Sequence, residues 1–266
     1  CHPERQCRIF SESREHSVTS WNGIKMIHIS ARRFESDRPS FGTMQHTREH
    51  SEAEQMKYII MCGGTYEKWD IPKPMTPIKG EPIVARTIRL LKENGVDDIA
   101  ISSNNELFEQ FGVSVLHHDN PFTLPSSGRA KTPWLDAFYP MAEPVCYIFG
   151  DVVFSPEAIE TIVNTDTDSI EFFASAKPLP RIYPKHWAEP FAFKVKDTEQ
   201  FFNAIEVTKQ FDKQGLFKRQ PVSWELWQVI KGTPLNKVDY TNYVRINDYT
   251  CDIDEPKDIK LFERLV

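Results

Sequence analysis

Apolar residues of this chain fall into short runs from about residue 57 onward, separated by glycines, prolines and polar clusters. Runs typical of buried strands cover 58–61, 98–102, 113–116, 145–149, 170–175, 191–195 and 244–246. Segments with helical character lie at 83–94, 106–111, 132–141, 158–164, 198–210, 224–231 and 256–265. Because strands that alternate with helices through short connections form mostly parallel sheets, the pattern predicts an α/β fold with helices flanking the sheet.

Residues 1–55 differ from the rest of the chain. They are rich in Ser, Arg, Glu and His and show little sustained periodicity, apart from one short strand predicted at 24–29. Such a composition buries little apolar surface. We therefore expect an N-terminal extension over 1–55 and a folded domain over 56–266.

Composition and charge exclude several classes of protein. Hydrophobic residues make up 40% and charged residues 26% of the 266, a balance typical of globular domains. A net charge of −6 argues against a nucleic-acid partner. No apolar run approaches the roughly 18 residues that a membrane helix needs, and no secretory signal is evident. The five cysteines, Cys1, Cys7, Cys62, Cys146 and Cys251, form no CxxC pair, so we expect a reducing, cytoplasmic environment.

A glycine loop after the first strand is the first candidate for chemistry. Cys62-Gly63-Gly64 follows the apolar run directly, and Lys73 comes a few residues later. Paired glycines let backbone amides approach anionic oxygens, and a lysine neutralises phosphate charge. The alternative is a tight turn followed by a surface lysine.

Two acidic motifs are the second candidate. Asp151 follows Gly150 at the end of an apolar strand, where open α/β sheets bind ligands and a carboxylate can hold a divalent metal. Asp252 and Asp254 would point to one face of an extended segment. The alternative for Asp151 and for Asp254 is to cap a neighbouring turn or helix.

These motifs occur in an order that resembles the nucleoside-triphosphate transferase superfamily. The matching residues are Pro72-Lys73-Pro74, Gly80-Glu81-Pro82-Ile83, Asn94-Gly95-Val96-Asp97-Asp98-Ile99 and the closing Asp252-Ile253-Asp254-Glu255-Pro256-Lys257-Asp258. The resemblance covers roughly residues 57–266 and is closest to phosphocholine cytidylyltransferases and small sugar-phosphate nucleotidyltransferases. It implies a Rossmann-like, three-layer GT-A-like fold with a mixed, mostly parallel sheet, a nucleotide-binding half over about 56–155 and an acceptor-binding half over about 156–266.

The resemblance also implies a role for each motif. Lys73 and Asp151 would be catalytic, and Asp151, Asp252 and Asp254 would bind Mg²⁺. The nucleotide, CTP or UTP, would contact Cys62, Gly63, Gly64, Thr65, Lys68, Lys73, Ser127, Gly128, Lys131 and Thr132. One element departs from the family, because Thr65-Tyr66-Glu67-Lys68-Trp69 replaces a G-x-G-x-R loop, so Lys68 would stand in for the arginine. The reaction would transfer a nucleoside monophosphate to phosphocholine or a sugar phosphate and release pyrophosphate.

The acceptor site is expected among aromatic residues of the second half. Trp187, Glu189, Phe191, Trp224 and Trp227 are the candidates, since an aromatic cage suits a quaternary ammonium. The alternative for each ring is packing in the core or a lid. Two rival functions stay open: a glycosyltransferase of similar fold that uses a nucleotide-sugar, and a non-catalytic nucleotide-binding protein.

Overall fold

The computed structural model describes residues 17–21, 24–28, 56–66, 69–119, 123–124, 134–175 and 188–266. The chain divides into two compact units, Cys1–Glu49 and His50–Val266. In the first unit, β1 (Ser17–Trp21) pairs antiparallel with β2 (Ile24–His28). The strand expected at 24–29 is therefore present, and it belongs to a hairpin whose other strand was not expected.

The second unit is built on a seven-stranded sheet with the order β14-β12-β13-β10-β3-β7-β8. Its strands are β3 (Lys57–Met61), β7 (Ile99–Ser102), β8 (Ser114–Leu116), β10 (Val145–Phe149), β12 (Ile170–Ser175), β13 (Glu189–Val195) and β14 (Val244–Arg245). Only β13 runs antiparallel to its neighbours, β10 and β12; the other pairs are parallel. The predicted mixed, mostly parallel sheet is confirmed.

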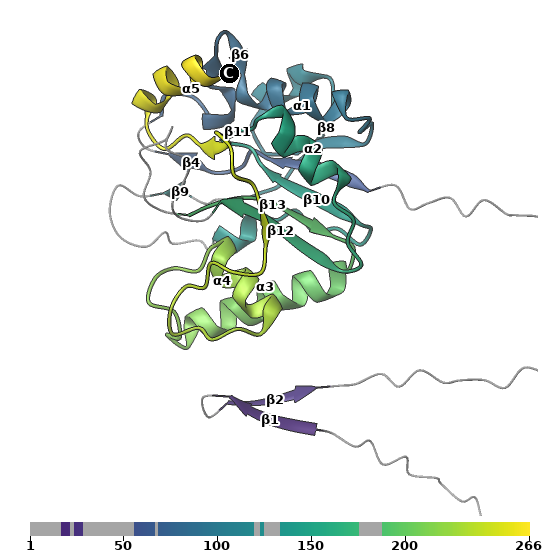
Figure 1. Ribbon diagram of the computed structural model, residues 1–266, viewed down its shortest axis with the longest axis vertical. Helices are drawn as coiled ribbons and strands as arrows, with labels where there is room; N and C mark the ends of the chain where they lie inside the picture. Colours follow the sequence, from purple (N-terminus) through teal and green to yellow (C-terminus); the bar gives the residue numbers. More distant parts are fainter. Residues whose placement is uncertain are drawn as a thin grey trace, which may run out of the picture. The chain divides into compact units, whose positions relative to one another are not determined.

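Helices cover both faces of this sheet (Figure 1), which makes the three layers of the predicted α/β fold. In the view shown, α1 and α2 lie above the sheet, and α3 and α4 lie below it. The helices are α1 (Ile83–Glu93), α2 (Pro156–Asn164), α3 (Thr198–Lys213), α4 (Ser223–Lys231) and α5 (Ile259–Leu265), with short 3-10 helices η1 (Lys73–Met75), η2 (Glu106–Phe111), η3 (Trp134–Ala137) and η4 (Pro256–Asp258).

The helix expected over 132–141 is much shorter. Within the described residues only η3 forms there, and Phe138, just after it, is buried against Tyr147, Phe193 and Phe201. Pro140 follows, and proline disfavours a helical conformation of the residue before it. The 3-10 helix therefore ends at Ala137, and the next residue, Phe138, packs its ring into the core.

Three short pairs of strands join loops of the second unit outside the seven-stranded sheet. They are β4 (Thr65–Tyr66) with β9 (Thr123–Leu124), β5 (Pro77–Ile78) with β6 (Glu81–Pro82), and β11 (Val152–Val153) with β15 (Cys251–Asp252). None of those three pairs was predicted, because two-residue strands carry no periodicity. They matter because they hold the loops that carry the candidate motifs.

The core between sheet and helices is dominated by aromatic rings. Phe193 on β13 lies at its centre, with its ring stacked on Phe172 and close to Phe138, Phe201 and Trp227. Aromatic pairs in such arrangements stabilise beyond the area that they bury. The sheet that positions the candidate site therefore rests on this cluster.

Phe193→Ala is expected to lower the free energy of unfolding by about 3–5 kcal/mol, because a fully buried ring with several aromatic neighbours leaves a cavity that the rigid sheet cannot close. Urea denaturation followed by circular dichroism measures the loss. Leu107→Ala, at a side chain that is 49% exposed, serves as the control and should change stability by less than about 0.5 kcal/mol. Similar losses in both variants would contradict this account of the core.

Candidate active site

The loops after β3 and β10 meet at Gly150. Its amide donates to the Met61 carbonyl at 3.1 Å. A Cβ atom at this position would lie 2.5 Å from the Met61 oxygen and 2.8 Å from Cys62 Sγ, closer than real Cβ contacts allow. Only glycine lets the two strand ends approach this closely, and this approach places Asp151 next to the glycine loop.

The glycine loop is fixed at its start to the neighbouring strand β7. The Cys62 amide donates to the Ser102 carbonyl at 3.0 Å, and Ser103 Oγ donates to the Cys62 carbonyl at 3.2 Å. Gly64 then adopts a left-handed φ of +84°, a conformation that favours glycine. Gly63 and Gly64 are both partly exposed, so backbone of this loop faces solvent beside Asp151.

Cys62 does not act as a nucleophile in this arrangement. Burial, and to a smaller extent the charge of Asp151, raise the pKa of the Cys62 thiol well above its ordinary value. The thiol therefore stays protonated at neutral pH, whereas a reactive cysteine needs the thiolate. Cys62 serves as a small, neutral side chain under the loop.

The atypical part of the loop pairs with the segment that leads to residues 125–132. β4 runs parallel to β9, with Thr65 opposite Thr123 and Tyr66 opposite Leu124. Thr65, which is expected to contact the nucleotide, is thus held by pairing with Thr123. Lys68, Ser127, Gly128, Lys131 and Thr132 lie outside the described residues.

The two acidic motifs are brought together by β11 and β15. Val152 pairs with Asp252 and Val153 with Cys251 in antiparallel register, and the Ile253 amide donates to the Asp151 carbonyl at 3.1 Å. Ile253 is fully buried in a small second core with Phe262 of α5. Asp151 and the closing acidic segment are therefore fixed side by side, although about a hundred residues separate them.

A polar network locks this pairing from the other side. Ser155 caps α2, because its Oγ accepts a hydrogen bond from the Ala158 amide. The same Oγ donates a hydrogen bond to Asp248 Oδ2 at 2.5 Å. The Ser155 amide donates to Thr250 Oγ1 at 3.0 Å, and the Thr250 amide donates to Asp248 Oδ1 at 2.7 Å. The sequence points to only one of these residues: Ser155 before Pro156 is typical of a helix cap.

Lys73 joins the two acidic motifs. Its ammonium nitrogen lies 3.3 Å from Asp151 Oδ2 and 3.9 Å from Asp254 Oδ1, and its side chain is only 4% exposed. The two carboxylates are partly exposed. A cationic atom thus already lies between oxygens of the kind that Mg²⁺ prefers, so the donor set fits a divalent cation.

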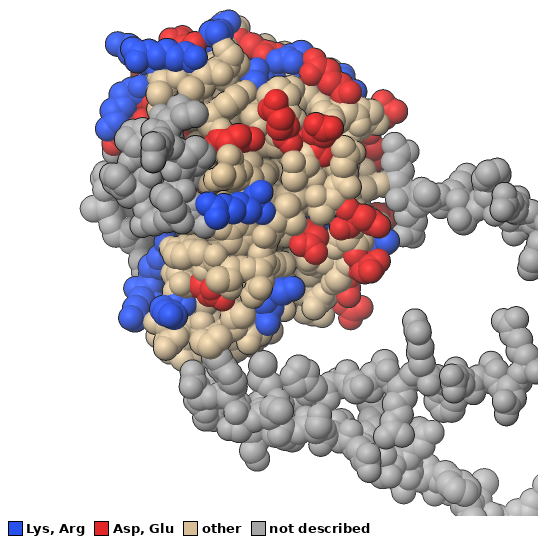
Figure 2. Space-filling view, viewed as in Figure 1, with Lys and Arg blue, Asp and Glu red and all other residues tan. Residues whose placement is uncertain are grey.

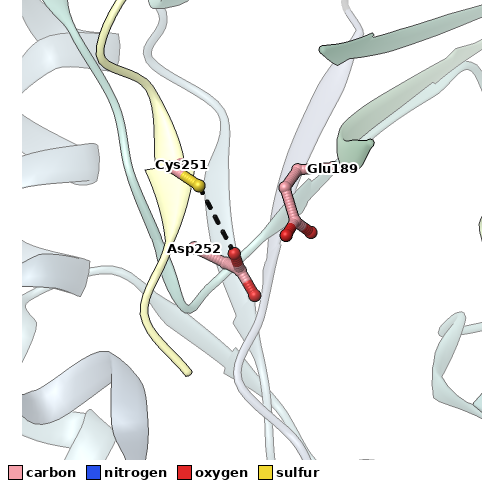
Figure 3. Close-up of side chains that lie close together, drawn as sticks. All are labelled: Glu189, Cys251 and Asp252. Atoms are coloured by element: carbon pink, nitrogen blue, oxygen red, sulfur yellow. Dashed lines mark hydrogen bonds between the residues drawn. The ribbon is translucent and has the colours of Figure 1, made fainter. Parts of the chain in front are cut away.

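Asp252 lies close to Glu189 and Cys251. One ligand atom each from Glu189, Cys251 and Asp252 lies within 4.8 Å of the others, and Figure 3 shows the Glu189 carboxylate directed towards that of Asp252. Glu189 comes from the start of β13 and is buried, whereas Asp252 is half-buried. The alternation along the extended segment places buried Ile253 between the two aspartates.

The described aromatic candidates of the acceptor site are core residues. Phe191 is fully buried against Phe154, and Trp224 and Trp227 are each 2% exposed. Both tryptophans pack on Phe172. These rings present no face to a ligand, which agrees with the alternative of core packing. Trp187 lies outside the described residues.

Surface charge does not form one basic tract on the face that Figure 2 shows. Lys and Arg side chains lie there in separate groups, with acidic side chains between them.

Among the helices that the structure describes, none has the length and apolar character needed to cross a membrane.

Gly150→Ala is expected to lower the free energy of unfolding by about 2 kcal/mol or more, because the new methyl group meets a backbone carbonyl that cannot move aside cheaply. Gly215→Ala is the control: Gly215 has a φ of +73° with open space around it, so its loss should be only about 1 kcal/mol of backbone strain. Equal losses in urea denaturation would contradict the close approach as a constraint.

Solved structures of other proteins resemble this chain in fold. A protein provisionally named glucose-1-phosphate thymidylyltransferase from Bacillus anthracis superposes with a TM-score of 0.50 and 14% identity, over 79% of this chain and 94% of that one. HddC from Yersinia pseudotuberculosis gives 0.48 and 16%, over 79% and 100%, and an inositol-1-phosphate CTP transferase from T. maritima gives 0.47 and 12%, over 79% and 96%. The first likeness shows the fold.

Sequence comparison identifies the family. No curated protein sequence matches the chain significantly. A family model described as the MobA-like NTP transferase domain matches residues 58–200, more than half of the 266 residues. The matched region contains the glycine loop, Lys73 and Asp151. The chain therefore belongs to the MobA-like NTP transferase family and is a nucleotidyltransferase.

Proposed function

We propose that this nucleotidyltransferase transfers a nucleoside monophosphate from CTP or UTP to a small phosphorylated acceptor, phosphocholine or a sugar phosphate, with Mg²⁺ as cofactor. The nucleotide-binding half is residues 56–155, and the acceptor-binding half is residues 156–266. The five cysteines favour a reducing, cytoplasmic location.

One observation carries the proposal. Lys73 lies within ion-pair distance of both Asp151 and Asp254, next to the glycine loop. Three charged groups from three separate segments thus converge beside backbone that can approach phosphate. A triphosphate with its metal needs this combination of carboxylates, a lysine and accessible amides.

The reaction requires little acid–base chemistry from the protein. A phosphate oxygen of the acceptor attacks the α-phosphorus of the triphosphate, a new P–O bond forms, and the bond to the β-phosphate oxygen breaks to release pyrophosphate. Lys73 binds the phosphates, and Gly63 and Gly64 cradle them, so positioning and charge neutralisation dominate. Asp151 and Asp254 would hold Mg²⁺, which when bound would offset the charge that develops on the phosphate oxygens.

Acceptor recognition is assigned to the acidic pair Glu189 and Asp252 in place of an aromatic cage. The two carboxyl groups lie close together on neighbouring elements, beside the metal-binding segment. Carboxylates accept hydrogen bonds from sugar hydroxyls and also attract a quaternary ammonium. Both acceptor classes therefore remain within the proposal, and an assay must separate them.

Asp151→Ala is expected to reduce turnover by roughly 10³-fold, because it removes a carboxylate that fixes the charge-neutralising metal. Pyrophosphate release under saturating nucleotide and Mg²⁺ measures the loss, and circular dichroism checks the fold. Asp97→Ala, the same substitution at an exposed aspartate after α1, is the control and should keep wild-type turnover. Turnover near wild type in Asp151→Ala would remove Asp151 from the mechanism.

A substrate panel tests the chemistry itself. Each of the four nucleoside triphosphates is mixed with Mg²⁺ and with phosphocholine or one of several sugar 1-phosphates, and pyrophosphate is measured. We expect release only with CTP or UTP and one acceptor class. Release with purine nucleotides alone would overturn the base preference.

A nucleotide-sugar assay and a calorimetric titration, run beside the panel, separate the rival functions. Consumption of a nucleotide-sugar without pyrophosphate release would indicate a glycosyltransferase. Calorimetric binding of CTP or UTP without turnover on any acceptor would indicate a non-catalytic nucleotide-binding protein.

A further inference from the structure

The position of the Lys73 ammonium suggests a second role for this residue. It lies close to Asp151 and Asp254, the two carboxylates that the proposed function assigns to the metal, at 3.3 and 3.9 Å from their nearest oxygens. An ion that bound both carboxylates would lie about 2.1 Å from an oxygen of each. The lysine nitrogen, which is close to the same two oxygens, would therefore crowd that ion and repel its charge.

The backbone of Lys73 is fixed, so that only its side chain can vacate this position. Prolines flank Lys73 on both sides, and Pro72 has a φ of −53° at the start of η1. The Thr76 amide donates to the Lys73 carbonyl at 3.0 Å, and the Met75 amide donates to the Pro72 carbonyl at 2.8 Å. A lysine side chain has a flexible four-carbon stem, so its ammonium can move while its Cα stays in place.

We propose that Lys73 holds the place of the metal in the nucleotide-free protein and moves onto the phosphates when the nucleotide arrives with its metal. This inference rests on the proposed function, because it takes Asp151 and Asp254 as metal ligands. It adds that metal alone binds in competition with Lys73, whereas metal with a triphosphate does not.

The charges of Lys73, the two carboxylates and the metal determine whether loss of the lysine strengthens or weakens metal binding. Metal that binds without nucleotide must displace an ammonium from two carboxylates and leave it beside a doubly positive ion. Metal that binds with a triphosphate offers that ammonium a new anionic partner. Nucleotide and metal therefore bind with positive coupling through Lys73, and removal of its charge strengthens metal binding in the free protein.

The test measures Mn²⁺ binding to the full chain without nucleotide, by electron paramagnetic resonance of the free ion. Lys73→Met, which keeps the apolar stem and removes the charge, is expected to bind Mn²⁺ roughly fivefold or more tightly than wild type, equivalent to about 1 kcal/mol. Lys73→Arg keeps the charge and should bind no more tightly than wild type. Lys73→Gln provides a second neutral variant if Lys73→Met fails to fold.

Lys257→Met is the matched control, since it removes one positive charge from the same acidic segment. Lys257 is 77% exposed and pairs with Glu255. Its loss should change Mn²⁺ affinity by less than about twofold, because solvent screens an exposed charge. An equal gain of Mn²⁺ affinity in Lys257→Met and Lys73→Met would mean that only the net charge of the protein matters, and would overturn the inference.

A further variant separates this inference from the proposed function. Asp151→Asn in the Lys73→Met background should abolish the gained Mn²⁺ affinity. If Asp151→Asn weakens binding but Lys73→Met binds no more tightly than wild type, the inference is wrong and the proposed metal ligand stands. If Asp151→Asn changes nothing in either background, both the metal site and the inference fail.

Discussion

The antiparallel pairing of β11 with β15 is the interaction on which the candidate site depends. Only two residues of each strand take part, Val152 with Asp252 and Val153 with Cys251. Alone, such a short pair has little stability. It persists because the Ser155–Asp248–Thr250 network holds one side and buried Ile253 anchors the other. Through it, the carboxylates of Asp151 and Asp254 come within reach of one lysine.

Close packing of the two strand ends is the second requirement. Gly150 lets the loop after β10 lie against Met61 and Cys62, so that Asp151 lies next to the glycine loop. A central sheet with rigid neighbours supports this contact, because β3 and β10 are adjacent parallel strands in register from Lys57 with Val145 to Met61 with Phe149. The adjacent strands therefore fix where the loops that carry the site residues begin.

Charge balance explains why Lys73 is tolerated in a nearly buried position. A buried ammonium without partners would be unfavourable, but two carboxylates compensate for it here. On the proposed function, a divalent cation would bind the same two carboxylates. Stability of the free protein and affinity for the metal would then be linked through one side chain, since each cation would satisfy the same oxygens.

Three features differ from what the sequence predicted: the aromatic cage, the first hairpin and the helix over 132–141. Tryptophans and phenylalanines suit either a ligand cage or a core, and periodicity alone does not separate the two. Trp224 and Trp227 are buried among other rings and therefore belong to the core. The first hairpin was missed although Asn22-Gly23 is a strong turn signal between strands. The helix over 132–141 was overestimated because the burial of Phe138 prevails over local propensity.

Local pattern by itself predicted the order of strands and helices and marked the glycine loop, Lys73 and the two acidic motifs as candidates, to which the family resemblance gave roles. These features depend on neighbours along the chain, such as apolar runs and turn residues. Tertiary structure alone decided which side chains meet: Lys73 with both Asp151 and Asp254, and Asp252 with Glu189. The reason is that such contacts arise where segments far apart in sequence pack together, and local periodicity carries no information on that pairing.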